Sequence, residues 1–183
     1  MIDEVTAQDV LNFWFEECSP PQWFIKDADF DGLIAQRFGA CVEQALNGAL
    51  DHWCESREGC LALILVLDQF TRNAHRDTPK AFAGDVKALS VSSLCRERGY
   101  LNHPHQGWRH FMLIPMMHSE DLAVQEASLP LFQQHTDARV HGYAVRHRDI
   151  IARFGRYPHR NIILGRVSTP EEKEFLTQPG SSF

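Results

Sequence analysis

The sequence predicts an all-α protein, and three observations carry that prediction. Apolar residues recur at three- and four-residue spacing through most of the 183 residues. The segment 61–67 is apolar at every position, which is typical of a helix buried in the middle of a domain. No two stretches alternate polar and apolar residues as a pair of strands would. We therefore expect one all-helical domain over residues 1–183, with about eight or nine helices in antiparallel hairpins and a tail that frays from about 178.

Start and stop signals divide the first half of the chain into helices. Helix starts are indicated by capping residues, or by proline in the first turn, at Thr6, Asp29, Thr78-Pro79 and Gly84-Asp85. Helix ends are indicated at Ser19-Pro20-Pro21, Asn47-Gly48 and Gly99. The buried helix is expected from about 57 to 70.

The second half follows the same logic. A helix over 106–117 should be kinked or ended by Pro115, and Ser119 should cap the next one, which is bent near Pro130. An arginine-rich helix is expected over 137–154, stopped by Gly155. Two short helices should follow, one over 158–165 and one after the capping box Thr169-Pro170-Glu171-Glu172.

The overall composition is that of a soluble cytoplasmic protein. The net charge of −6 and pI near 5.9 make nucleic acid an unlikely partner. The five cysteines are widely spaced, as in buried thiols of a reducing compartment. The start MIDEVTAQDV lacks the features of a signal peptide, and the longest apolar run, CLALILVL, is too short to span a membrane. No cofactor fingerprint is present, so we expect no cofactor.

Positive charge is concentrated in one segment against this acidic background. Residues 139–166 contain seven of the fourteen arginines and a single acidic residue, Asp149. Clustered guanidinium groups repel one another, so they usually meet carboxylates, phosphates or another anion. On the helix, Asp149 falls between Arg146 and Arg153, which also fits a purely structural network.

Two other polar runs are candidates for a site. Asp68, Gln69, Arg72 and Asn73 end the buried helix, where Asp68 and Arg72 either anchor the next loop or line a pocket. His118, Ser119, Glu120 and Asp121 form a dense run at a helix start. His147 is expected to be a core histidine. Five residues could in principle bind a metal, but none has a known ligand spacing, so we expect no metal: His118, Glu120, Asp121, His147 and His159.

Three long strings resemble a bacterial family catalogued as domain of unknown function 924. They are LALILVLDQFTRNAHRDTPKAFAGD, MLIPMMHSEDLAVQE and RHRDIIARFGRYPHRNIILGRVSTPEEKEFL, in that order. Thr71 stands where the family form DQFPRN has proline. The resemblance covers nearly the whole chain and implies a tetratricopeptide-like helical fold, but no established activity. It also implies that the polar runs belong to one shared site.

The first hypothesis is a pocket for a small anionic ligand, phosphate or carboxylate, and it leaves open whether a reaction follows binding. The expected anion contacts are Arg72, Arg153, Arg156 and Arg160. Asp68, Asp149 and Glu120 would orient them. His118 and His159 would transfer protons, with Glu120 as a third catalytic candidate, and Gln69, Asn73 and Asp121 complete the set.

Two other hypotheses remain. The chain is alternatively a protein-interaction module that binds an acidic peptide in a helical-repeat groove. RNA binding through the basic segment is the weakest possibility, because the chain is acidic overall.

Overall fold

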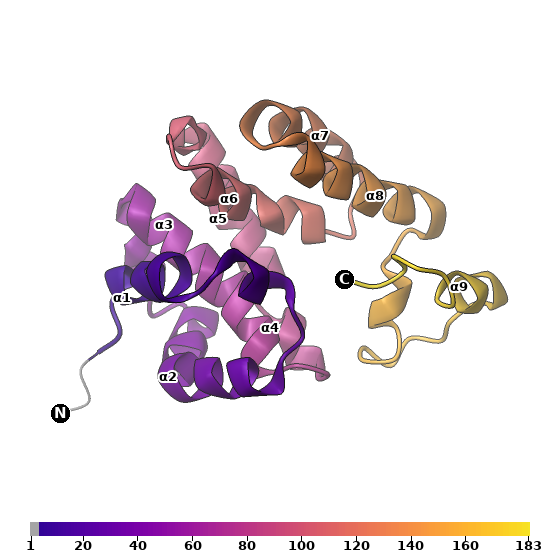
Figure 1. The fold of residues 1–183 in the computed structure, drawn as a ribbon, viewed down its shortest axis with the longest axis horizontal. Coiled ribbons are helices and arrows are strands. Elements are labelled where there is room, and N and C mark those ends of the chain that lie inside the picture. The colour runs from indigo at the N-terminus through magenta and orange to yellow at the C-terminus, as the bar shows by residue number, and fades with distance from the viewer. Residues whose placement is uncertain (1–3) are drawn as a thin grey trace.

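The computed structural model describes residues 4–183, and these contain helices and no strand, which confirms the predicted all-α class (Figure 1). Short 3₁₀ and π-helical turns connect or extend the helices. The α-helices are α1 (Ala7–Asn12), α2 (Ala28–Asn47), α3 (Arg57–Ile64), α4 (Thr71–Ala74), α5 (Asp85–Glu97), α6 (Gln106–His118), α7 (Leu122–His135), α8 (Ala138–Phe154) and α9 (Pro170–Phe175).

Side-chain caps set most of the helix starts. Thr6 and Asp9 form a capping box at α1, and Thr169 and Glu172 form another at α9, as the sequence predicts. Gly155, with a φ of 68°, ends α8 where glycine is expected.

Two helix starts differ from the prediction for local reasons. Asp27 rather than Asp29 caps α2, because its Oδ1 accepts hydrogen bonds from the amides of Asp29 and Phe30, both at 2.9 Å. Asp121 rather than Ser119 caps α7, since its carboxylate accepts from the Ala123 amide at 2.8 Å. Helix α6 continues past Pro115 to His118, close to the predicted bounds, so of the two effects expected of Pro115 it does not end the helix.

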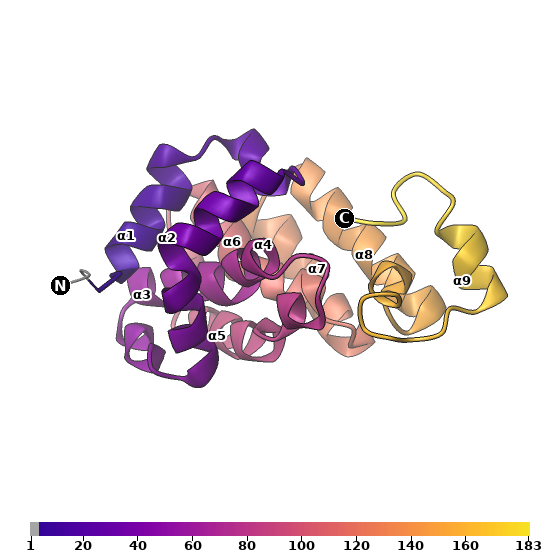
Figure 2. The same ribbon diagram turned by 90° about the horizontal axis from the view of Figure 1, so that it is seen from below.

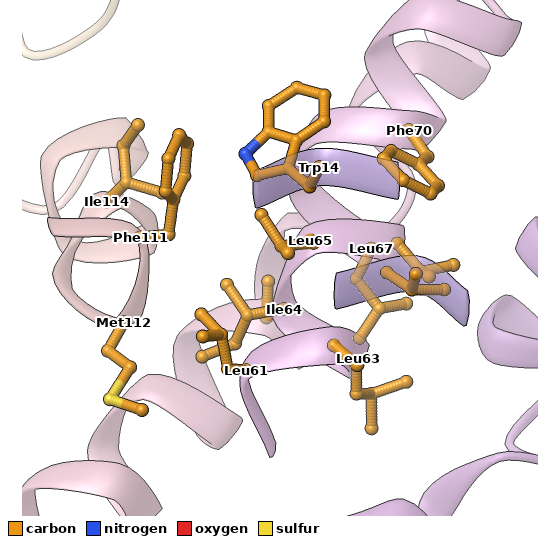
Figure 3. Packing of buried hydrophobic residues seen from close by; sticks show 14 of the residues in the cluster. Trp14, Leu61, Leu63, Ile64, Leu65, Leu67, Phe70, Phe111, Met112 and Ile114 are labelled. Carbon is orange, nitrogen blue, oxygen red and sulfur yellow. The ribbon is translucent and has the colours of Figure 1, made fainter. Parts of the chain in front are cut away.

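The buried helix predicted over 57–70 is the centre of the core (Figure 3). It consists of α3 and a π-helical turn, Leu65–Phe70, which leads without a break into α4. Every residue from Leu61 to Leu67 is fully buried. Helices α1, α5 and α6 pack against α3, and α2 packs against the π-helical turn and α4. Side chains on all faces of this helix therefore contact other helices.

The later helices add to this core in sequence. Helix α6 packs on α5, α7 on α6 and α8 on α7. Figures 1 and 2 both place α9 at the opposite end of the molecule from α1. There, Ile150, Ile151 and Tyr157 form a small second cluster with Phe154 and Phe175. The tetratricopeptide-like arrangement and the single-domain boundaries stay predictions.

The tail after α9 returns toward α8, where the Phe183 ring lies 3.8 Å from the His147 ring between centroids. Within residues 4–183, no helix is both long and apolar enough to cross a membrane.

We expect Leu65→Ala to lower the free energy of unfolding by about 2–5 kcal/mol, because it removes buried contacts and leaves a cavity. Leu33→Ala in α2 is the matched control, since Leu33 is 41% exposed, and it should cost less than about 1 kcal/mol. Chemical denaturation measures both. A loss below about half a kcal/mol at Leu65 would show that the segment is peripheral.

Candidate functional site

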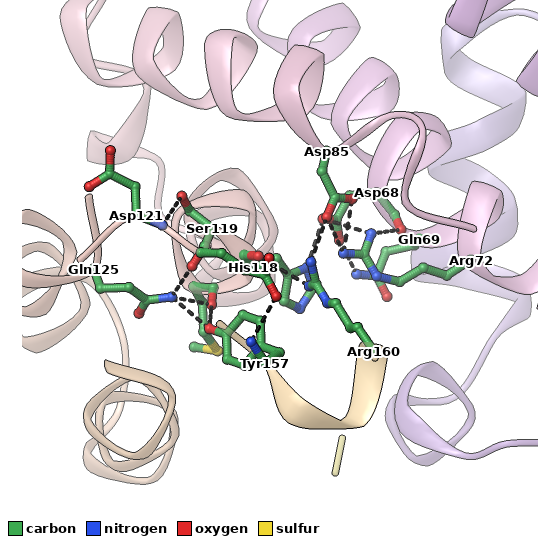
Figure 4. Close-up of polar contacts among 12 residues, drawn as sticks. Asp68, Gln69, Arg72, Asp85, His118, Ser119, Asp121, Gln125, Tyr157 and Arg160 are labelled. Carbon is green, nitrogen blue, oxygen red and sulfur yellow. Dashed lines mark hydrogen bonds and ion pairs between the residues drawn. The ribbon is translucent and has the colours of Figure 1, made fainter. Parts of the chain in front are cut away.

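Four charged side chains meet where the central helix leaves the core (Figure 4). Arg72 Nη1 lies 3.1 Å from Asp68 Oδ1, and Arg72 Nη2 lies 3.0 Å from Asp85 Oδ1. Arg160, from the 3₁₀ turn Pro158–Arg160, places Nη1 3.2 Å from Asp85 Oδ2. The charges alternate in sign along this chain of contacts and sum to zero. We call these four residues the ionic cluster.

Burial raises the free-energy cost of the charges in the ionic cluster, because the charged groups lose contact with water. The Asp68 side chain is fully buried and that of Arg160 is 7% exposed. Burial alone would raise the pKa of Asp68, but Arg72 and His118 together hold it below its ordinary value. Burial and the neighbouring Arg72 lower the pKa of Arg160, which Asp85 partly counteracts. Each charge is therefore stable only while its partners stay in place.

His118 joins this group through Asp68. Its Nδ1 lies 2.7 Å from Asp68 Oδ1, and the other oxygen of Asp68 accepts a hydrogen bond from Gln69 at 2.5 Å. An ionised carboxylate can only accept, so Nδ1 must carry the proton. Burial lowers the pKa of His118, although Asp68 opposes the shift. The imidazole is thus neutral near pH 7, and Nε2 has an available lone pair.

A second set of contacts fixes the loop that carries Arg160. The Tyr157 hydroxyl donates to the Met117 carbonyl at 2.5 Å and accepts from Gln125 at 2.6 Å. Glu120 accepts from the Tyr157 amide at 2.7 Å and from Arg166 at 2.7 and 3.0 Å. Arg160 Nη2 donates to the His118 carbonyl at 3.1 Å. These bonds hold the basic loop against the end of α6.

Three buried polar atoms in or beside the ionic cluster have no hydrogen-bond partner among residues 4–183: Arg160 Nε, His159 Nδ1 and Asp85 Oδ1, the last of which is still in ion-pair contact with Arg72. The His159 ring packs between Tyr157 and Phe183, and burial followed by the charge of Arg160 lowers its pKa to about 3. The guanidinium groups of Arg72 and Arg160 both lie over the Phe82 ring, 5.6 and 4.5 Å from its centroid. A buried donor without a partner is costly, so it indicates a place for a ligand or a water molecule.

The structure brings together about half of the predicted site residues. Asp68, Gln69, Arg72, His118 and Arg160 are in direct contact, with Glu120 and His159 beside them. The other five have partners outside the ionic cluster: Asn73 bonds to Asp31, Asp121 caps α7, Asp149 pairs with Arg148, Arg153 with Glu171 and Arg156 with Glu172.

Most arginines of the segment 139–166 pair with carboxylates of the same protein. Besides the last three of those pairs, Arg160 pairs with Asp85 and Arg166 with Glu120. The Arg156 guanidinium holds the pKa of Glu172 at about 2. The charge concentration seen in the sequence is therefore largely the basic half of a set of ion pairs, as the structural alternative predicts.

Three residues of the site carry no distinct signal in the sequence. Asp85 bridges both arginines, but a carboxylate in the first turn of a helix already has a dipole explanation. Tyr157 and Gln125 act through contacts with segments about 30 to 40 residues away along the chain.

Neither of two surface hollows elsewhere is lined by the ionic cluster or His118. One, of about 620 Å³, lies between α2 and α4 and includes Asn73. The other, of about 180 Å³, lies between α1 and α6. In the described part of the chain, no three His, Cys, Asp or Glu side chains are arranged to hold a metal ion.

His147 gives a pH prediction. Its ring is 7% exposed, its Nδ1 lies 2.8 Å from the Tyr143 carbonyl, and burial lowers its pKa to about 3. The unfolded chain, with a histidine pKa near 6.5, binds the proton first, so stability present above about pH 6.5 is lost as the pH falls toward 3.

Between pH 7 and pH 5, proton binding to His147 in the unfolded chain should lower the free energy of unfolding by up to about 2 kcal/mol. Denaturation curves at both pH values should show a smaller difference for His147→Gln than for the parent protein. Equal differences would show that His147 does not stay neutral in the folded state.

Comparison with known proteins gives the family without an activity. A family model described as bacterial protein of unknown function, DUF924, matches residues 10–180. No curated protein matches the chain. The solved structure of ATU0120 from Agrobacterium tumefaciens, a protein of unknown function, is 40% identical. The match covers 93% of this chain and 96% of that one, with a TM-score of 0.87. The chain belongs to the DUF924 family of bacterial proteins.

Proposed function

We propose that the ionic cluster and His118 bind a small oxyanion, a phosphate or a carboxylate, with Arg160 as its main contact and His118 as the group that accepts or donates a proton. The observation that carries this proposal is the buried Nε of Arg160, which has no partner among residues 4–183. Arg160 reaches the His118 carbonyl as well, so an anion on its guanidinium would lie close to the imidazole.

The chemistry of the group fits this ligand. A guanidinium can grip two oxygens of a planar or tetrahedral anion through paired hydrogen bonds, and such bonds strengthen when water is excluded. Asp85 has both Arg72 and Arg160 as partners, so one of them can turn to a ligand without leaving the carboxylate alone. Phe82 supports both guanidinium groups from beneath.

The zero net charge of the ionic cluster gives His118 a role in binding. An added anion makes the site negative, and a proton on His118 Nε2 restores neutrality. A bound oxyanion should therefore raise the pKa of His118, against the burial that lowers it in the free protein. A group whose proton affinity changes with the ligand is suited to act as a general base and acid, so the proposal extends to an enzyme of acid–base type.

The acidic-peptide alternative would use a different surface. It needs the more exposed arginines of α8, such as Arg153, whose side chain is 49% exposed. A tetratricopeptide-like groove belongs to this alternative. Variants of Arg153 and Arg160 therefore separate the two proposals.

We expect millimolar phosphate, sulfate or malonate to raise the melting temperature more than chloride at the same ionic strength. At about ten times its dissociation constant, a ligand of the native state adds about 1.4 kcal/mol, or roughly 3–6 °C in melting temperature for a domain of this size. Arg160→Met and Arg160→Lys should lose most of this rise, while Arg153→Met should keep it.

Circular dichroism first establishes that each variant is folded. Anions that do no better than matched chloride would leave the ionic cluster a structural network. Loss of the rise in Arg153→Met, but not in the Arg160 variants, would favour the peptide groove on α8.

The proton state of His118 is a separate test. Because Asp68 can only accept at Nδ1, long-range ¹H–¹⁵N NMR at pH 7.5 should show a neutral His118 with its proton on Nδ1. Addition of the anion should raise its pKa. His118→Asn identifies the resonance. A proton on Nε2 in the free protein would remove the proposed base.

A further inference from the structure

The hollow between α1 and α6 has an aromatic wall, and it lies apart from the ionic cluster. Its volume is about 180 Å³, which is below the roughly 300 Å³ of the smallest typical drug-sized pockets and suits a small head group. The wall consists of Phe15, His103, His105 and Trp108. The lining also includes Gln8, Asn12 and Glu16, and it contains no lysine or arginine.

The aromatic rings form one connected group. The His103 ring stacks on Trp108 with centroids 4.2 Å apart and planes 8° apart. Phe15 lies 6.0 Å from Trp108 and meets the His105 ring edge-on at 5.6 Å. His103 Nδ1 accepts a hydrogen bond from the His105 amide at 3.1 Å, and burial lowers its pKa, so it is mostly neutral near pH 7. These rings present π-electron faces and edges at the wall.

The wall is held in place without a ligand. Arg109 donates to the carbonyls of His103 at 2.6 Å, Pro104 at 2.9 Å and His135 at 2.7 Å. These hydrogen bonds occupy the guanidinium group of Arg109 and hold the loop that carries His103 and Pro104. A methyl group added at Gly107 would lie 3.0 Å from the His105 ring, so this residue allows the close approach of the imidazole. A preformed wall lowers the entropy cost of binding.

The rim supplies a negative charge. Gln8 donates to Asn12 at 2.7 Å, and Glu16 follows four residues later, where the helix widens into a π-helical turn, Phe13–Glu17. The Glu16 side chain is exposed and forms no ion pair or hydrogen bond within residues 4–183, whereas the neighbouring Glu17 pairs with Arg37. Short π-helical turns are frequent at functional sites. The lining combines this carboxylate with aromatic rings and contains no lysine or arginine, a combination that favours a cation.

We propose that this hollow binds a small alkylated ammonium group. Methyl groups on the nitrogen would contact the rings of Phe15 and Trp108, while the positive charge is attracted to the ring faces and to Glu16. An alkylated ammonium loses less hydration than a lysine-type amine, and it fits a half-apolar hollow better than an inorganic cation does. This site and the proposed anion site share no residues, so a negative result at one does not affect the other.

The test compares choline with 3,3-dimethyl-1-butanol, its uncharged isostere, by isothermal titration calorimetry. Matched sodium chloride serves as the reference for ionic strength. We expect saturable choline binding in the millimolar range and binding of the alcohol at least about tenfold weaker, because the alcohol retains the shape but lacks the charge.

Two variants locate the site. Glu16→Gln should weaken choline binding about two- to fivefold, the range of an exposed charge contact, while Glu126→Gln on the exposed face of α7 should leave it unchanged. Phe15→Leu should weaken it further while keeping an apolar side chain against the core. The proposal is overturned by any of three results: no saturable choline binding beyond sodium chloride, equal binding of the alcohol, or equal affinities in the two glutamate variants.

Discussion

The buried carboxylate of Asp68 is the constraint on which the rest of the site depends. It lies at the end of a helix whose preceding turns are apolar on every side, and it is fully buried. An isolated carboxylate there would cost several kcal/mol, so its charge requires close partners. Arg72, His118 and Gln69 supply them from three directions. The ionisation of Asp68 then fixes the tautomer of His118.

That constraint extends to the C-terminal part of the molecule. Arg72 also binds Asp85 on α5, Asp85 binds Arg160, and Arg160 binds the carbonyl of His118. The basic loop is therefore joined to the central helix through alternating charges, while Tyr157 and Glu120 fix its backbone. Directional polar contacts such as these position the small cluster around Ile150 and Ile151, which forms a core separate from the main one.

The fold could be predicted from the sequence further than the site could. The apolar segment 61–67 and the caps at Thr6 and Thr169 are signals that depend on residues close together in the sequence. The structure shows the expected burial and the expected caps at these positions. Asp68, His118 and Arg160 were recognisable as candidates, but their pairing links positions 42 to 50 residues apart in sequence. Helical periodicity gives a residue's face and not its partner.

Arg153 shows the same limit, because its partner Glu171 lies on the next helix, beyond the reach of a helical wheel. Asp85 was missed because its place at a helix start already had an electrostatic explanation.

Stability alone does not account for the ionic cluster. Buried ion pairs can often be replaced by apolar side chains at little cost or even with a gain in stability. At this position two carboxylates and two guanidinium groups occupy space next to a core that Leu, Ile and Phe fill elsewhere. They also leave the Nε of Arg160 without a hydrogen bond in the described chain. In a network with only a structural role, a buried donor is expected to have a partner. His118 pairs with Asp68 through Nδ1, and its backbone carbonyl accepts a hydrogen bond from Arg160 Nη2. Both the unpaired donor and the nearby imidazole suit an oxyanion that exchanges a proton with His118, and this is why the proposed function gives the ionic cluster a ligand in addition to its structural contacts.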